Sequence, residues 1–163
     1  MMAGMSEMTR RDVLVGLAAM GTGVAVGQEA AVEPHTVEPH AAAGDFAGGS
    51  KVFALAGEAA TKNANGSERK SVFDGTLATG EVMSMHESWS PVGAAAAAHV
   101  IKHSELIVVI EGTIGFEHDG KVDTASAGDV VYVAYGTNHS IKNAGTVTAR
   151  YMVLQMGGDT KKA

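Results

Sequence analysis

Two segments of this sequence space glycine, histidine and acidic residues in a way that suits metal chemistry. Imidazole and carboxylate groups are the side chains left to hold a divalent metal when thiolates are absent, and this chain of 163 residues has no cysteine. Each segment alone is a weak signal, but together they place two histidines and a glutamate at fixed intervals between glycines. The first reads Gly93, five residues, His99, Val100, Ile101, three residues, Glu105, six residues and Gly112, and the second reads Gly128, five residues, Ala134, Tyr135, Gly136, two residues, His139, three residues and Asn143.

This pair of segments resembles the two motifs of the cupin family, G-x5-H-x-H-x3,4-E-x6-G and G-x5-P-x-G-x2-H-x3-N. Two positions depart from the pattern, because Ile101 stands where the second histidine is usual and Ala134 stands where proline is usual. The resemblance implies an all-β fold, the cupin double-stranded β-helix or jelly-roll barrel. It says less about activity, because one fold hosts many chemistries.

The resemblance also implies a metal site. In cupins the motif residues project from strands into the barrel, which here would give His99, Glu105 and His139 as ligands, with Ile101 facing the same cavity as an apolar wall. Two imidazoles and one carboxylate are the donors of the facial triad that binds non-haem Fe(II), and Mn, Ni and Zn accept the same donors. His103 either replaces the missing imidazole as a tentative fourth ligand or makes outer contacts. The alternative is a metal-free barrel, which would leave Glu105 as a buried unpaired charge.

Composition limits the other possibilities. The length suits one domain and not two. An apolar share of 45% with many small and β-branched residues fits a β-rich globule. The net charge is −6 and there is no basic stripe, which argues against a nucleic-acid partner. The lack of cysteine excludes disulfides and thiolate nucleophiles.

Residues 1–28 are predicted to be an export signal. Thr9–Leu14 resembles the twin-arginine pattern S/T-R-R-x-F-L, with Val13 in place of the usual Phe. The apolar run that follows, Val13–Val26, would span roughly 21 Å as a helix. That is shorter than the ~30 Å hydrocarbon core, so a cleaved signal is predicted rather than a stable membrane span. The protein is therefore expected in the periplasm; the alternative is an amphipathic helix of a cytosolic protein.

Residues 29–50 repeat the tetrapeptide Val-Glu-Pro-His at 32–35 and 37–40 and then run into alanine and glycine. Proline and the scarcity of large apolar side chains predict a disordered linker. The cupin domain is then expected at residues 51–159. Within it, many short strands separated by turn signals favour a barrel or jelly roll.

Four predictions concern the strands and turns around the site. Alternation places Ser84 and His86, taken as an ordinary strand histidine, on one face of a strand. The alanines before His99 are expected to form a strand or loop approach to the site despite their helix propensity. Residues 105–111 are apolar at both parities, so both faces should be covered, one by the barrel interior and one by the second sheet or a partner subunit in a homodimer. His118 is placed, solvated, at the tip of an Asp-Gly hairpin.

The functional hypothesis is an exported, divalent-metal-binding cupin that acts on a small molecule with oxygenase- or isomerase-like chemistry. The alternative is a non-catalytic periplasmic cupin that binds a small ligand or a metal. No catalytic residue can be assigned, and Tyr132, Tyr135 and Ser84 are candidate proton acceptors by chemistry alone. The inner face is predicted to be poor in polar groups, which favours an apolar or aromatic ligand.

Overall fold

The computed structural model describes residues 41–158, so the predicted export signal and most of the predicted linker lie outside the described residues. Every regular element among residues 41–158 is a strand, which confirms the all-β prediction. No helix in that part of the chain is long and apolar enough to cross a membrane. The strands are β1 (Ala43–Gly44), β2 (Thr61–Lys62), β3 (Glu68–Thr76), β4 (Val82–Ser90), β5 (His99–Val100), β6 (Ser104–Glu111), β7 (Thr113–His118), β8 (Lys121–Ser126), β9 (Val130–Val133), β10 (Asn138–Asn143) and β11 (Ala149–Met156).

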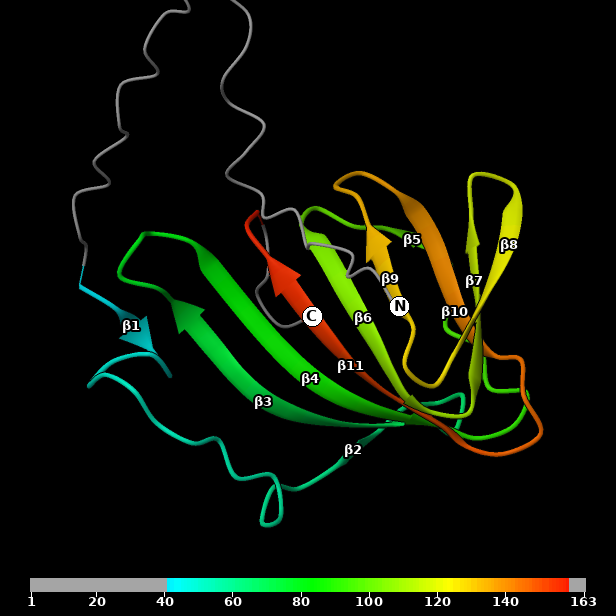
Figure 1. The fold of residues 1–163 in the computed structure, drawn as a ribbon, viewed down its shortest axis with the longest axis horizontal. Coiled ribbons are helices and arrows are strands. Elements are labelled where there is room, and N and C mark those ends of the chain that lie inside the picture. The colour runs from blue at the N-terminus through cyan, green and yellow to red at the C-terminus, as the bar shows by residue number, and fades with distance from the viewer. Residues whose placement is uncertain (1–40, 159–163) are drawn as a thin grey trace, which may run out of the picture. The chain divides into compact units, whose positions relative to one another are not determined.

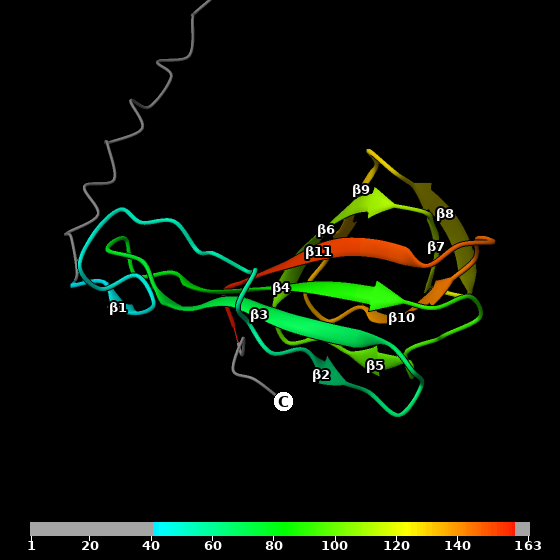
Figure 2. The ribbon, with the colours of Figure 1, turned by 90° about the horizontal axis from the view of Figure 1, so that it is seen from below.

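These strands form two antiparallel sheets (Figure 1 and Figure 2). The larger sheet has the order β1-β3-β4-β11-β6-β9 with β2 added beside β3, and the smaller has the order β5-β10-β7-β8. Sequence neighbours such as β5 and β6 therefore lie in different sheets, as in a jelly roll. The predicted jelly-roll architecture is confirmed.

The core lies between the sheets because each strand alternates its side chains. β6 contributes Ile107 and Val109, and the smaller sheet contributes Ile114 and Phe116, to one buried cluster. Ile101, which replaces a motif histidine, is 2% exposed and belongs to the same cluster. It points inward, as the sequence predicted, so an apolar side chain fills the position that a metal ligand occupies in the family pattern.

The glycines of the two segments are required by the turns that separate the strands. Gly93, Gly112, Gly128 and Gly136 all have positive φ, between 74° and 95°. At Gly112 a Cβ atom would also lie only 3.0 Å from the Cα of Ala149. Glycine alone tolerates both the left-handed backbone and the close strand approach, which explains why the glycine spacing identified the fold.

The folded domain begins earlier than the predicted boundary at residue 51. Ala43 and Gly44 pair with β3, and the Asp45 carboxylate accepts a hydrogen bond of 2.8 Å from the backbone of Asp74. The Phe46 ring lies 5.0 Å from that of Phe73. The end of the predicted linker is therefore part of the domain, because one aromatic side chain in an alanine- and glycine-rich stretch is enough to anchor it.

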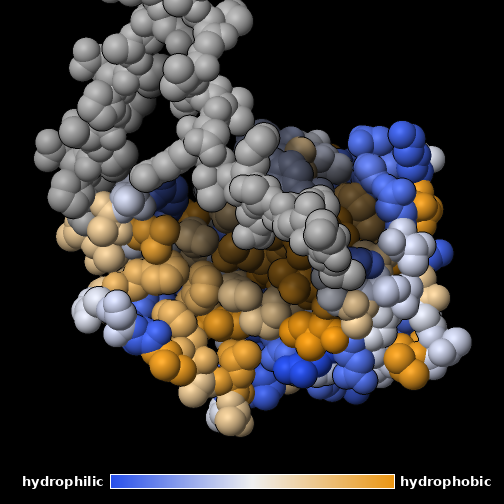
Figure 3. Space-filling view, in the orientation of Figure 1, coloured by the Kyte–Doolittle hydropathy of each residue, from blue (hydrophilic) through white to orange (hydrophobic). Residues whose placement is uncertain are grey.

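The outer face of the larger sheet is apolar. β6 turns Val108 and Ile110 outward, each 40% exposed, and the adjacent β9 turns out Val130 and Tyr132, at 58% and 61%. In Figure 3, hydrophobic residues gather over the middle strands of this sheet, while the β7–β8 hairpin is hydrophilic. The inner face of β6 is covered by the barrel interior, as predicted, whereas within residues 41–158 its outer face stays partly open.

Candidate functional site

Glu105 is the centre of a hydrogen-bonded network on the inner face of the larger sheet. Its side chain is buried, and its Oε1 atom accepts a hydrogen bond of 2.9 Å from Gln155 Nε2 and lies 2.8 Å from His103 Nε2. The Ser84 hydroxyl donates to Gln155 Oε1 at 2.7 Å and so fixes the amide. The second carboxylate oxygen, Oε2, lies 3.6 Å from His139 Nε2. One oxygen is thus held by neighbours and the other faces an imidazole.

His99 and His139 lie side by side because β5 and β10 pair these two residues directly. Their ring centroids are 5.0 Å apart. His99 is exposed, and its Nδ1 atom lies 3.2 Å from the carbonyl oxygen of Ala97. A hydrogen bond from Nδ1 orients the ring and leaves Nε2 as the nitrogen that could bind a metal. His139 is 4% exposed, and burial lowers its pKa, an effect that Glu105 opposes and His99 reinforces. The neutral imidazole, the form that binds metals, is therefore favoured.

The distance between the Glu105 carboxylate and the His139 ring can be compared with the separation of two ligand atoms in a metal site. A distance of 3.6 Å between Glu105 Oε2 and His139 Nε2 is too long for a hydrogen bond. It is close to the ~3.4 Å that separates two ligand atoms held about 2.1 Å from one tetrahedral metal. Among residues 41–158, no group of three or more histidine or acidic side chains converges on one point. Of the three expected ligands, Glu105 and His139 lie at about such a spacing, and His99 does not converge on the same point.

His103 lies beside Glu105 rather than beside the imidazole pair. Its Nε2 contacts the oxygen that also accepts the Gln155 bond, and its side chain is 11% exposed. This is the outer-contact position that the sequence allowed as one of two roles for His103. Gln155 was not found by sequence reasoning, because it lies outside both segments and reaches Glu105 only through the pairing of β11 with β6.

The inner face is much more polar than the sequence predicted. Register pairs β4 with β11 so that Ser84 faces Gln155, His86 faces Val153 and Ser88 faces Tyr151. The Tyr151 hydroxyl is hydrogen bonded to the side chains of Ser90 and Ser88, and burial raises its pKa. The prediction of a polar-poor interior is wrong, because the polar residues come from β4 and β11, which flank the segments that guided it.

The same register changes the candidates for proton transfer. Tyr132 and Tyr135 are 61% and 66% exposed, so these two candidates lie outside the barrel interior. His86 lies inside, on the same face of β4 as Ser84, and alternation predicted that these two residues share a face. Burial, followed by the charge of Arg69, lowers the pKa of His86 to about 4. Its imidazole is therefore neutral near pH 7 and only weakly basic.

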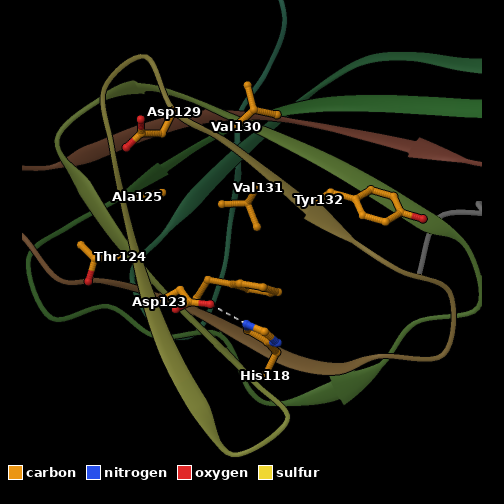
Figure 4. A pocket seen from close by; sticks show the side chains of 9 residues that line it. His118, Asp123, Thr124, Ala125, Asp129, Val130, Val131 and Tyr132 are labelled. Carbon is orange, nitrogen blue, oxygen red and sulfur yellow. Dashed lines mark hydrogen bonds and ion pairs between the residues drawn. The ribbon is translucent and has the colours of Figure 1, made fainter.

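A hollow of about 540 Å³ opens between β8 and β9, the edge strands of the two sheets (Figure 4). His118 and Asp123 turn toward one another there, 2.8 Å apart, and Val131 points into the same space. The His118 ring stacks on Phe116 at 4.2 Å, and the carboxylates of Asp123 and Asp119 raise the pKa of His118. His118 thus lies beside the hairpin turn, as predicted, and its ring also lines the hollow. Phe116 also lies 5.8 Å from the His139 ring.

Asn143, the last residue of the second segment, has a structural role. Its Nδ2 donates to the carbonyl oxygens of Ser90 and Val147, both at 2.7 Å, and its Oδ1 accepts from the Gly145 backbone at 2.8 Å. The amide ties the end of β4 to the turn before β11. It therefore holds in place the two strands that carry the polar inner face.

Residues 89–155 match the family model of the cupin domain, and both segments lie in or beside that range. This match and the jelly-roll fold together support placing the domain in the cupin family. The chain is similar to an RmlC-like cupin from Shewanella frigidimarina (20% identity, 68% of this chain and 95% of that chain, TM-score 0.56). It is also similar to KdgF from Halomonas sp. (18% identity, 68% and 96%, TM-score 0.55) and to the polyketide cyclase RemF from Streptomyces resistomycificus (13% identity, 69% and 87%, TM-score 0.53). At sequence identities of 13–20%, the similarity to these structures is evidence for the fold alone. No curated protein matches the sequence.

Proposed function

We propose that this protein is a divalent-metal-binding cupin that acts on a small molecule inside the barrel. Glu105, His139 and His99 would hold the metal, which can be Fe, Mn, Ni or Zn for this donor set. The observation that carries the proposal is the 3.6 Å approach of a buried carboxylate oxygen to a buried neutral imidazole. His103 is assigned to orienting Glu105, since it contacts the oxygen opposite to the one that faces His139.

A bound metal would supply a Lewis acid or an oxygen-binding centre, which suits oxygenase- or isomerase-like chemistry. The protein's own residues have separate tasks. Ser84, Gln155 and His103 fix Glu105, so the carboxylate needs no reorganisation when a metal binds. His86 would present a neutral imidazole on the inner face of β4 as a hydrogen-bonding group for the bound small molecule.

Elemental analysis of protein purified without chelator or affinity metal tests this proposal. The wild-type protein should contain one transition metal per chain, and His139→Ala should contain less than a tenth of that amount. His118→Ala is the matched control, because it removes a histidine of the β8–β9 hollow and should leave the metal content unchanged. A metal content that His139→Ala does not alter would contradict the site.

A second candidate function, non-catalytic binding of a small ligand, is favoured by one observation. Glu105 Oε1 already accepts two interactions, so the buried carboxylate has partners without a metal. The expectation that a metal-free Glu105 would be unpaired does not hold for this oxygen. Native mass spectrometry distinguishes the two functions: a retained organic ligand in a protein without metal supports the binder.

The proposal includes export to the periplasm by the twin-arginine route. Its support is the sequence Thr9–Leu14 before a short apolar run, a stretch outside the described residues. Replacing Arg10 and Arg11 with lysine should retain the protein in the cytoplasm, and cell fractionation measures the outcome. Unchanged delivery of the double variant would contradict the route.

A further inference from the structure

Arg69 is a cation on the inner face of β3 that the site described above does not use. Cross-strand register pairs Arg69 with Ser88, and Ser88 pairs in turn with the core residue Tyr151. Residues that pair directly share one face of a sheet. The side chain of Arg69 therefore leaves the sheet on its inner side, diagonally adjacent to His86.

The guanidinium of Arg69 has no protein partner in the part of the chain that the structure describes, although the residue is partly buried. Arg150, in contrast, is paired with Glu87 and lies over the Trp89 ring. Lys70, the next residue on β3, faces outward and donates to the carbonyl oxygen of Leu55. A partly buried guanidinium with five unused donors is costly unless an acceptor reaches it.

The charge of Arg69 acts on the same interior as the Glu105 network. Burial is the main cause of the lowered pKa of His86 and the Arg69 charge is the second, while Glu105 opposes them and His103 adds to them. The pKa of His86 thus depends on both the Arg69 cation on β3 and the Glu105 carboxylate on β6. Arg69 and Glu105 thus lie on the same inner face of the larger sheet, with His86 on β4 between their strands.

We propose that Arg69 binds the carboxylate group of the small molecule that occupies the barrel interior. This ligand class rests on the function proposed above, since it assumes that the interior is the binding site. A guanidinium binds a carboxylate with two parallel hydrogen bonds, which would orient the rest of the molecule. Its reactive part would then extend toward Glu105 and His139.

The surroundings favour a singly charged carboxylate over a phosphate or an apolar ligand. One guanidinium balances one negative charge, and the groups beside it, Ser71, Ser88 and the neutral His86, add no further cation. Glu105, which faces the same interior from β6, would repel a dianion more strongly than a monoanion. A purely apolar or aromatic ligand offers no acceptor and would leave Arg69 unpaired.

Calorimetric titration with three probes tests the assignment: acetate, its neutral analogue acetamide, and methyl phosphate. Acetate should bind the wild-type protein in the millimolar range and acetamide should not bind. Arg69→Met should weaken acetate binding at least tenfold, and Arg69→Lys should weaken it less because the charge remains. Lys70→Met is the matched control: it removes a cation from the adjacent, outward position and should change acetate binding less than twofold. Thermal denaturation confirms that each variant is folded.

Several outcomes would overturn the inference: binding unchanged in Arg69→Met, binding weakened equally in Lys70→Met, or methyl phosphate bound more tightly than acetate. Titrations before and after metal removal by a chelator separate this inference from the proposed function. Acetate binding that needs the metal and not Arg69 would contradict the role of Arg69 and support the metal site. Acetate binding that needs Arg69 and persists after metal removal would support the role of Arg69 independently of the metal.

Discussion

His86 makes the stability of the domain depend on pH in a direction that the structure fixes. Its pKa is about 4 in the folded protein, compared with 6.5 as the ordinary value. Because the folded value is the lower one, the unfolded chain takes up the proton first as the pH falls. The contribution of neutral His86 is complete above pH 6.5 and is lost progressively toward pH 4. At 1.36 kcal/mol per pKa unit, lowering the pH from 7 to 4.5 should cost about 2 kcal/mol.

Urea unfolding of the wild-type protein and of His86→Gln at these two pH values, with chelator present, measures this term. Glutamine keeps hydrogen-bonding groups but has no proton to gain, and the carboxylates common to both proteins cancel in the comparison. The wild-type protein should lose about 2 kcal/mol more than the variant. Arg69→Met should reduce that loss, because the Arg69 charge contributes to the lowered pKa. Equal pH dependence in wild type and His86→Gln would refute a buried neutral imidazole.

Phe46→Ala should destabilise the domain by about 1–3 kcal/mol, less than the loss of a fully buried phenylalanine. Val52→Ala, at an exposed position, should not destabilise it. Equal melting temperatures of the wild-type protein and Phe46→Ala in calorimetry would restore a boundary at residue 51. Asn143→Ala removes three hydrogen bonds and should cost about 3 kcal/mol in urea unfolding, and a cost below about 1 kcal/mol would contradict its structural role. The apolar outer face predicts a homodimer. Analytical ultracentrifugation should show that Ile110→Glu converts this dimer to a monomer. A wild-type protein that is monomeric at tens of micromolar would contradict the predicted dimer.

The fold was predictable from sequence because its turns depend on glycine at fixed intervals. Gly112 allows both a left-handed turn and the close approach of Ala149, so its place in the spacing pattern carries structural information. The pairing of His99 with His139 follows from the same pattern, since each residue stands at a fixed distance from a turn. The shared face of Ser84 and His86 followed from simple alternation along β4, whereas its inward orientation did not.

The rest of the site depends on contacts between residues far apart in the chain. Gln155 lies fifty residues from Glu105, and only the register of β11 against β6 brings them together. Arg69 faces the interior because β3 pairs with β4 in one register, and a shift of one residue would turn it outward. The sequence of β3 alone does not fix that register. Phe46 was missed because composition describes a stretch of chain and not a single anchoring contact.

Anomalous diffraction from crystals of the metal-loaded protein, recorded at the absorption edge of the bound metal, tests the central claim most directly. We expect one strong peak, within about 2.0–2.2 Å of both Glu105 Oε2 and His139 Nε2. The His99 ring should be turned toward this peak, and His103 should remain on Oε1 of Glu105. A peak elsewhere in the chain, or none between Glu105 and His139 in a crystal that contains the metal, would contradict it.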